Sequence, residues 1–108
     1  MRVHVFETLE DQEKGLQFLP HADPDTLYVF PEDWAGSTFH SRNVQERFEI
    51  AFLSIDYLTL SVTLMTPPHA IVQAPKRTAM AFEAVPGRFA HWGVVPGKTA
   101  LMPRSMEV

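Results

Sequence analysis

The sequence predicts a mostly β (α+β) fold, a small antiparallel sheet or barrel-like domain with one or two short helices. Nine prolines and five glycines interrupt the 108 residues at short intervals, as is typical of short strands joined by turns. Apolar and polar residues alternate over residues 58–66, the period of a half-buried strand, and we expect the face with Leu58, Leu60, Val62 and Leu64 to lie in the core. No repeat or linker divides the chain, so residues 1–108 are predicted to form a single domain.

Two short helices are expected from their end signals. Thr8 is a suitable N-cap for a helix over residues 9–14, because its hydroxyl can accept a hydrogen bond from the first turn. Gly15 is a suitable C-terminal stop for that helix. A single helical turn is expected over residues 88–92, closed by Gly93.

The remaining strands are expected where apolar runs lie between turn residues. These extended segments are residues 3–6, 27–30, 38–43, 48–53, 71–72, 78–85 and 99–102. The tail at residues 103–108 is expected to fray, because nothing in its sequence ties it to a core.

Composition and charge exclude several classes of partner. The net charge is −4 and no basic cluster occurs, so neither nucleic acid nor an anionic membrane is expected as the main partner. The chain has no cysteine, which excludes disulfides and thiolate chemistry. No apolar run approaches the ~20 residues that span a bilayer, and the N-terminus lacks the apolar stretch of a signal peptide. The cytoplasm is therefore the expected default location.

Metal, cofactor and nucleophile motifs are absent from the sequence. The five histidines do not pair at ligand spacing; they are His4, His21, His40, His69 and His91. We therefore predict no metal site and no cofactor. No nucleophile elbow, SxxK motif or glycine-rich phosphate loop occurs either.

One polar cluster is informative. His40, Arg42 and Asn43 follow one another closely, and an extended backbone would place His40 and Arg42 on one face. Glu49 and Glu83 each interrupt an apolar strand, where a carboxylate must be paired or protonated. One interpretation is a ligand pocket lined by these five residues. The alternative is a structural ion-pair network that fixes strand register, since such networks imitate active sites.

The aromatic residues are predicted to be mostly core. This group comprises Phe30, Trp34, Phe39, Phe48, Phe52, Phe82, Phe89 and Trp92. Trp34 differs from the others because it lies in a polar loop. We expect it to pack in the core or at the rim of a pocket.

The order of these features resembles the uncharacterised bacterial and archaeal family called "domain of unknown function 192". The resemblance covers about residues 7–102. It lies in Gly15-Leu16, Leu27-Tyr28-Val29-Phe30, Phe39-His40-Ser41-Arg42-Asn43-Val44, Arg47-Phe48-Glu49-Ile50, Phe52, Phe82-Glu83, Gly87 and the spacing of Gly93 and Gly97. This chain departs from the family pattern with His40 for Trp, Ser41 for Met, Arg42 for Lys, Arg47 for Pro and Glu49 for Asp. The resemblance implies a compact, mostly β fold and no particular activity.

The sequence leaves three functional interpretations open. The first is a non-enzymatic binding or accessory domain with a shallow polar cleft for a small polar ligand such as a saccharide. Arg42 and Asn43 would hold ligand oxygens there, with Glu49 orienting Arg42. The second is a glycoside-type hydrolase with Glu49 and Glu83 as its acid/base pair, which requires carboxyls roughly 5–9.5 Å apart. The third is a structural or protein-partner-binding domain with an exposed apolar patch near Trp34 or at residues 94–95.

Overall fold

The structure is a computed structural model that describes residues 1–31 and 34–100. Seven strands and two short helices form within these residues, which confirms the predicted mostly β class. The strands are β1 (Arg2–Val5), β2 (Thr26–Phe30), β3 (Thr38–His40), β4 (Phe48–Leu53), β5 (Thr59–Met65), β6 (Ile71–Gln73) and β7 (Met80–Ala84). The helices are α1 (Leu9–Lys14) and α2 (Arg88–His91).

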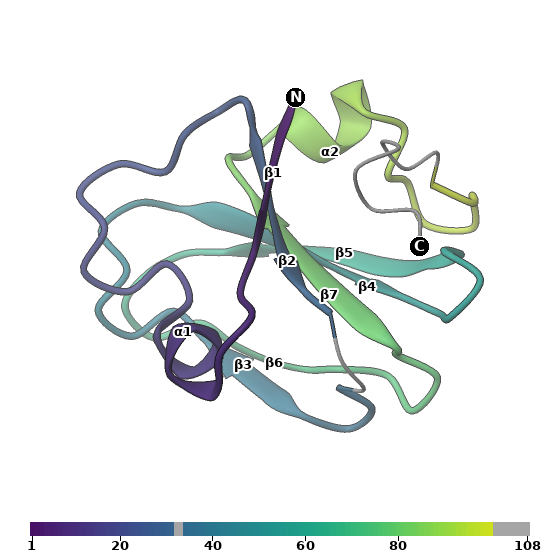
Figure 1. Cartoon of the computed structure of the whole chain (residues 1–108), viewed down its shortest axis with the longest axis horizontal. Coiled ribbons are helices and arrows are strands. Elements are labelled where there is room, and N and C mark those ends of the chain that lie inside the picture. Colours follow the sequence, from purple (N-terminus) through teal and green to yellow (C-terminus); the bar gives the residue numbers. More distant parts are fainter. Residues whose placement is uncertain (32–33, 101–108) are drawn as a thin grey trace.

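The strands form two sheets, of which the larger has five strands in the order β1-β2-β7-β4-β5 (Figure 1). A two-stranded antiparallel sheet, β3-β6, lies beside it. The larger sheet is mixed, which corrects the expectation of an antiparallel sheet. β1 pairs parallel to β2 because the chain returns through α1 before it re-enters the sheet, whereas the other neighbours are antiparallel.

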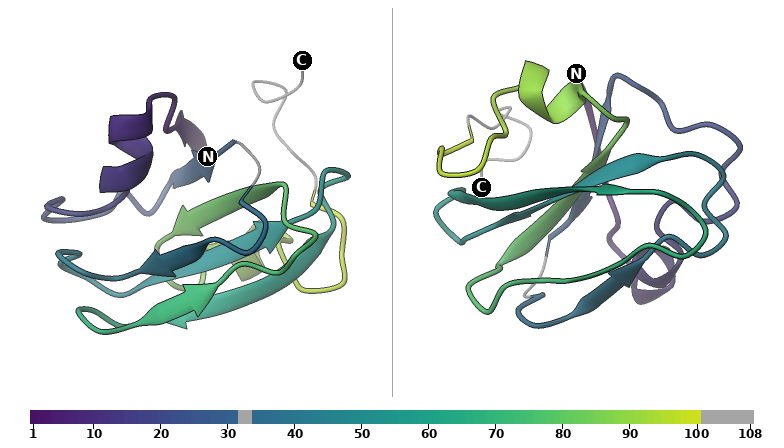
Figure 2. Two further views of the ribbon diagram at one scale, coloured as in Figure 1. Left: turned by 90° about the horizontal axis from the view of Figure 1, so that it is seen from below. Right: turned by 180° about the vertical axis from the view of Figure 1, so that it is seen from behind.

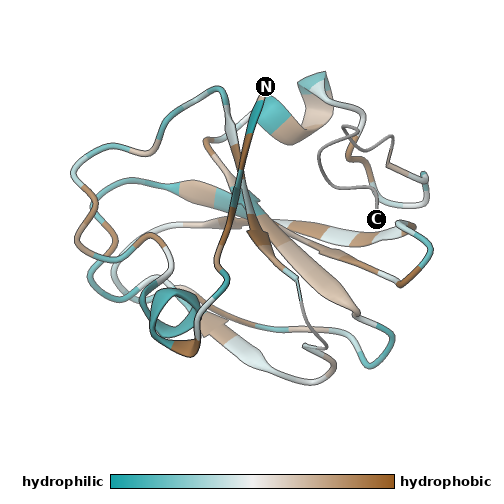
Figure 3. Cartoon of the chain, viewed as in Figure 1, coloured by the Kyte–Doolittle hydropathy of each residue, from teal (hydrophilic) through white to brown (hydrophobic). Residues whose placement is uncertain are grey.

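Each face of the larger sheet has its own cover. α1 and the β3-β6 sheet lie on one face, and α2 with residues 92–100 lies on the other (Figure 2). The hydrophobic residues gather on the central strands β2, β4 and β7 (Figure 3). Phe30, Phe48 and Phe52 belong to the first core cluster, on the face of α1, while Phe82 and Phe89 belong to the second core cluster, on the face of α2. These five aromatic residues are buried as predicted.

The predicted ends of α1 are confirmed. Thr8 Oγ1 accepts a hydrogen bond of 3.0 Å from the Asp11 N–H, as an N-cap does. Gly15 ends the helix at φ +52°, a left-handed value that glycine adopts without steric cost. Its N–H donates to the Asp11 carbonyl at 2.8 Å. The second helical turn forms at α2, as predicted.

β5 forms as predicted, but its predicted core face is buried only in part. A β-bulge opposite Phe52 and Leu53 places Thr59 on the same face as Val62 and Leu64, and on this face Thr59 is buried whereas Leu64 is 47% exposed. β5 is an edge strand, and the cover on the leucine-bearing side reaches Val62 but leaves Leu64 outside the core cluster. The alternation of apolar and polar residues therefore predicted the strand, while the bulge and the neighbouring layer determine which of its residues are buried.

β3 and β7 are shorter than the predicted segments 38–43 and 78–85. β3 ends at His40, and the next residues form a turn in which the Val44 N–H donates to the Ser41 carbonyl at 3.2 Å. In the described part of the expected last strand, residues 99–100, Thr99 forms a single bridge with Leu58. Residues 101–102 and the tail at 103–108 lie outside the described residues. Neither of the two described helices has the length and apolar character to cross a bilayer.

Candidate functional site

Glu83 lies at the centre of the larger sheet. It is on β7 and pairs with Tyr28 of β2 on one side and with Ile50 of β4 on the other. Its side chain is on the face covered by α1 and β3, and only 4% of the residue is exposed. Nothing in residues 1–31 and 34–100 forms a hydrogen bond or ion pair with its carboxyl group.

Burial changes the acidity of this carboxyl. Removal from water raises the pKa of Glu83 from 4.5 to about 8, because the charged form loses its hydration and gains no partner. At neutral pH the group therefore carries a proton. A protonated carboxyl can donate one hydrogen bond and accept others, which a carboxylate cannot do. The requirement that a carboxyl in this strand be paired or protonated is met by protonation.

A pocket of about 430 Å³ opens above Glu83. Its floor consists of buried side chains, including Leu16, Phe30 and Phe48, and its rim includes exposed residues of α1 such as Glu13 and Lys14. The full lining is Leu9, Gln12, Glu13, Lys14, Gly15, Leu16, Gln17, Phe30, Trp34, Thr38, Phe39, His40, Val44, Phe48 and Glu83. This volume is within the usual range for sites that bind small molecules.

Three aromatic rings form one wall of the pocket. The ring centroids of Phe30 and Trp34 are 5.7 Å apart, those of Phe30 and Phe39 are 5.5 Å apart, and those of Trp34 and Phe39 are 5.4 Å apart. Phe39 also contacts Phe52 in the core at 5.4 Å. Trp34 is half-buried and packs against the first core cluster, so the expectation of packing at a pocket rim is confirmed.

His40 lines the same pocket from the end of β3. Its Nδ1 accepts a hydrogen bond of 3.1 Å from the Arg42 N–H, and in this arrangement the ring proton is on Nε2. The Nε2–H is then a donor. His40 and Glu83 are the two predicted site residues that the structure brings into one pocket.

Glu49 belongs to the opposite face of the sheet. It is paired with Ala84 across the β4-β7 ladder, one register position away from Ile50 and Glu83. Successive side chains of a strand point to opposite faces, so the sheet separates the two carboxyl groups. Glu49 Oε1 instead accepts a hydrogen bond of 2.7 Å from the Gly87 N–H, before α2. The predicted acid/base pair of Glu49 and Glu83 is therefore wrong.

Arg42 and Asn43 lie in the exposed turn after β3. Because the strand ends at His40, the predicted shared face of His40 and Arg42 does not form. Asn43 adopts a left-handed φ of +62°, and its Nδ2 donates to Gln17 Oε1 at 3.2 Å. Its carbonyl accepts from the Phe18 N–H at 2.8 Å, so Asn43 ties the turn to the chain after α1.

The alternative of a structural ion-pair network among the candidate residues is also wrong. The ion pairs within the described residues lie elsewhere, at Arg2–Asp23, His21–Glu46 and Arg88–Asp25. Neither Arg42 nor Glu83 takes part in one. Histidine, aspartate and glutamate do not gather in threes anywhere in residues 1–31 and 34–100, so no metal-binding group is found there.

The contribution of α1 to the pocket was missed by the sequence reasoning. A methyl group added at Gly15 would lie 3.4 Å from Phe30 Cζ and 3.8 Å from Glu83 Oε1. Gly15 therefore keeps open the space directly above the carboxyl. The Gly15-Leu16 pair is the one sequence feature that indicates this arrangement, because a glycine that ends a helix lets the chain turn sharply across a neighbouring layer.

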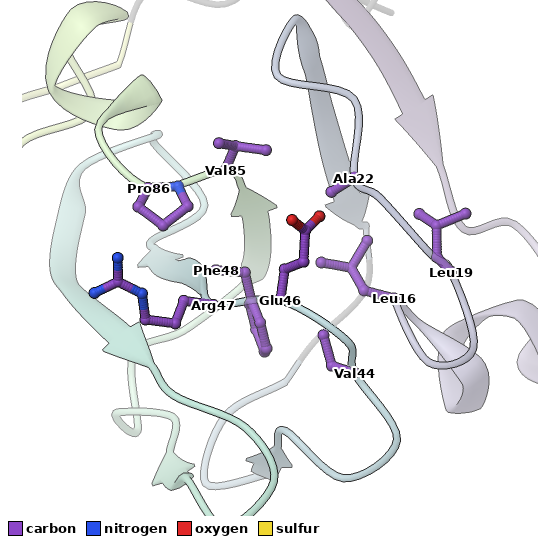
Figure 4. Close-up of a pocket in the computed structure, with 9 residues that line it drawn as sticks. All are labelled: Leu16, Leu19, Ala22, Val44, Glu46, Arg47, Phe48, Val85 and Pro86. Atoms are coloured by element: carbon purple, nitrogen blue, oxygen red, sulfur yellow. The ribbon is translucent and has the colours of Figure 1, made fainter.

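A smaller pocket of about 190 Å³ adjoins the first and shares Leu16, Val44 and Phe48 with it. Its charged lining residues are exposed, and Figure 4 shows Arg47 extending away from Glu46. Glu46 already binds His21 Nδ1 at 3.2 Å. The larger pocket is the better candidate because it alone of these two has a buried, unpartnered polar group.

The apolar patch expected at residues 94–95 does not form, because Val94 is 5% exposed and belongs to the second core cluster. Among residues 1–31 and 34–100, the exposed large apolar residues are instead spread along the sequence. They are Met1, Leu9, Phe18, Leu19, Ile55, Leu64 and Ile71. Leu9 and Leu19 line pockets, so part of this surface belongs to the two cavities already described.

Comparison with solved structures supports the fold. A protein of unknown function from Novosphingobium aromaticivorans matches with a TM-score of 0.78 and 24% identity, over 94% of this chain and 75% of the other. A protein described as a putative transcription regulator from Sinorhizobium meliloti matches with a TM-score of 0.76 and 21% identity, over 88% of this chain and 76% of the other. At these identities the likeness is one of fold. No protein-family model and no curated protein matches the chain, so the resemblance to domain of unknown function 192 stays a prediction.

Proposed function

We propose that this protein is a non-enzymatic binding domain for a small ligand that occupies the pocket above Glu83. The observation that carries the proposal is the state of Glu83: a buried carboxyl group without a partner, on the floor of an open pocket. This site replaces the shallow polar cleft of Arg42, Asn43 and Glu49 expected from the sequence.

Keeping a carboxyl group at position 83 lowers the stability of the fold. A carboxyl group that is removed from water without compensating hydrogen bonds destabilises the fold, and a hydrophobic residue or a glutamine at position 83 would avoid the charge. Proteins accept such destabilisation mainly where a residue serves function. Glu83 takes part in none of the ion pairs among residues 1–31 and 34–100, so an ion-pair network does not explain its presence.

The pocket suggests how a ligand would be held. The aromatic wall of Phe30, Trp34 and Phe39 would contact an apolar part of the ligand, as such walls do in most small-molecule sites. Glu83 on the floor and the Nε2–H of His40 would provide the polar contacts. A polar floor with an aromatic wall fixes both the position and the orientation of a ligand.

The same geometry argues for binding rather than glycoside hydrolysis. A glycosidase places two carboxyl groups on either side of one bond, at roughly 5–9.5 Å. Here the second carboxyl is on the far side of the sheet and is held by the Gly87 N–H. Glu49, the partner predicted for this reaction, is therefore not in the pocket of Glu83.

A fragment screen followed by amide chemical-shift mapping tests the proposal. The wild type, Glu83→Gln and Glu49→Gln would be screened by thermal shift, and hits would be mapped by nuclear magnetic resonance. We expect ligands that shift the amides of α1, β3 and β7, bind Glu49→Gln like the wild type, and bind Glu83→Gln more weakly. Hits that map outside this pocket, or an absence of hits for the folded wild type, would contradict the proposal.

A further inference from the structure

We propose that the ligand carries an organic ammonium group, which the carboxylate of Glu83 and the surrounding aromatic rings bind together. This inference rests on the proposed function and specifies the chemistry of the ligand. It follows from the charges that line the pocket and from the rings that enclose it.

The charge inside the pocket depends on Glu83. Glu13 and Lys14 also line the pocket, but both are exposed on α1, where water screens them. Lys14 forms no ion pair with Glu83, so the floor has no internal cation within the described lining. A ligand that brings a positive charge to the floor would supply the missing partner, whereas an anion would meet Glu83 and Glu13.

The aromatic wall favours the same class of ligand. The negative faces of aromatic rings attract cations, and quaternary or substituted ammonium groups are commonly bound in cages of aromatic side chains. Phe30, Trp34 and Phe39 are in mutual ring contact beside the carboxyl, and Phe48 adds a fourth ring to the lining. A carboxylate within an aromatic enclosure recognises both the charge and the alkyl surface of an ammonium group.

Binding of a cation should release a proton. The O–H bond of Glu83 breaks, its electron pair stays on the carboxylate, and the proton passes to the buffer while the carboxylate pairs with the ammonium. The other titratable groups that face this site are Tyr28 on β2, Glu13 and Lys14 on α1, and His40 on β3. The affinity for a permanent cation should therefore rise with pH until Glu83 is ionised in the free protein, at a pKa of about 8.

Matched pairs of ligands provide the test. Choline would be compared with dimethylbutanol, its neutral carbon isostere, and phenethylamine with phenethyl alcohol, by isothermal titration calorimetry near neutral pH. We expect each cation to bind at least about tenfold more tightly than its neutral isostere, because only the cation gains charge pairing with Glu83 and cation–π contact with the rings. Repetition in buffers of different ionisation enthalpy should show release of up to one proton for each bound cation.

Two variants separate the possible outcomes. Glu83→Gln should lose roughly ten- to a hundredfold of the affinity for cations and should release no proton, while Glu49→Gln should bind like the wild type. Equal binding of cations and isosteres, or preferential binding of saccharides or carboxylates at the same amides, would overturn the ammonium inference and leave the binding domain in place. If no probe of any charge perturbs the pocket of the folded wild type, both proposals fail.

Discussion

Glu49 and Glu83 show how neighbouring register positions give two carboxyl groups different chemistry. Glu49 points to the face of α2, where a backbone N–H satisfies its carboxylate at 2.7 Å. Glu83 points to the face of α1, where burial without a partner raises its pKa to about 8. Both are glutamates in apolar strands, so the sequence context of the two is nearly the same. Their environments, not their residue type, assign one to structure and the other to the pocket.

The raised pKa of Glu83 predicts a specific dependence of stability on pH. The unfolded chain loses this proton near pH 4.5 and the folded chain keeps it to about pH 8, so the folded state binds more protons between these values. The free energy of unfolding should therefore fall as pH rises through this window, by up to about 1.4 kcal/mol per pH unit from this group. In Glu83→Gln that contribution should be absent, and the variant should gain stability relative to the wild type as pH increases.

Urea denaturation of both proteins across this pH window measures the effect. The difference between the wild type and Glu83→Gln isolates Glu83, because every other ionisable group is present in both proteins. A difference that stays constant with pH, or a wild type that gains stability relative to the variant, would show that Glu83 is ionised in the folded state.

Glu49→Gln, unlike Glu83→Gln, should lower stability without changing ligand binding. Substitution removes the charge from a hydrogen bond to the Gly87 N–H, which should cost about 1–3 kcal/mol of unfolding free energy. Ligand binding in the pocket should be unchanged, because the sheet lies between the two sites. Thermal denaturation together with the calorimetric titration checks both parts, and a loss of affinity in this variant would mean that the two faces are coupled.

At the scale of elements, α1 defines the upper side of the pocket. Its cap at Thr8 and its stop at Gly15 fix where the helix ends above the sheet. The next residue, Leu16, is 3% exposed and anchors this end in the first core cluster. The pocket is therefore bounded by a capped helix and a sheet, which hold ligand contacts in more defined positions than free loops do.

Gly15→Ala tests this arrangement, with Gly97→Ala as the matched control. Both glycines have positive φ, +52° and +86°, so an alanine at either should cost roughly 1–2 kcal/mol of stability. At Gly15 the added methyl would also occupy space 3.8 Å from Glu83 Oε1, whereas nothing lies within 4 Å at Gly97. We expect Gly15→Ala alone to weaken ligand binding, as measured by calorimetry. Equal affinities for the two variants would place the ligand away from α1.

Helices whose ends are marked by nearby capping residues were predictable from the sequence. Features that depend on contacts with distant parts of the chain were not. The bounds of α1 follow from Thr8 and Gly15, which act within a few residues of the helix. Burial along β5 depends on the β-bulge opposite Phe52 and Leu53 and on how far the layer on each side of the strand extends, and the alternation of residues contains neither. The same holds for the parallel pairing of β1, since it depends on the route of the chain through α1.

At the scale of the whole molecule, the two faces of the sheet have separate roles. One face holds the pocket with Trp34, and the other holds α2, where Arg88 lies 5.1 Å from the ring centre of Trp92. The chain has two tryptophans, one on each face. Each face can therefore be observed by its own fluorophore.

Tryptophan fluorescence should report ligand binding from one face. In Trp92→Phe the remaining Trp34 lines the pocket, so saturation with ligand should change its emission. In Trp34→Phe the remaining Trp92 is on the other face and should respond little. A fluorescence titration of the two variants measures this, and a response from Trp92 of the same size as that from Trp34 would contradict the separation of the faces.

The candidate site was predictable in part. Glu83 stood out because a carboxyl group in an apolar strand needs a partner or a proton, and His40 was correctly placed with it. Arg42, Asn43 and Glu49 were assigned to the site from closeness in sequence and from the period of an extended chain. The turn after His40 and the register of β4 against β7 separate them from Glu83, and neither feature is visible without the three-dimensional pairing.

The most direct test of this account is a titration of the Glu83 side-chain carboxyl carbon by nuclear magnetic resonance, with Glu83→Gln used to assign its signal. The account predicts a pKa of about 8 in the free protein. It also predicts that this pKa falls when an ammonium ligand is bound. A pKa near the ordinary value of 4.5 would mean that Glu83 is ionised at neutral pH and that its charge is stabilised in the free protein. The central claim, that Glu83 is a buried carboxyl group without a partner in the free protein, would then be wrong.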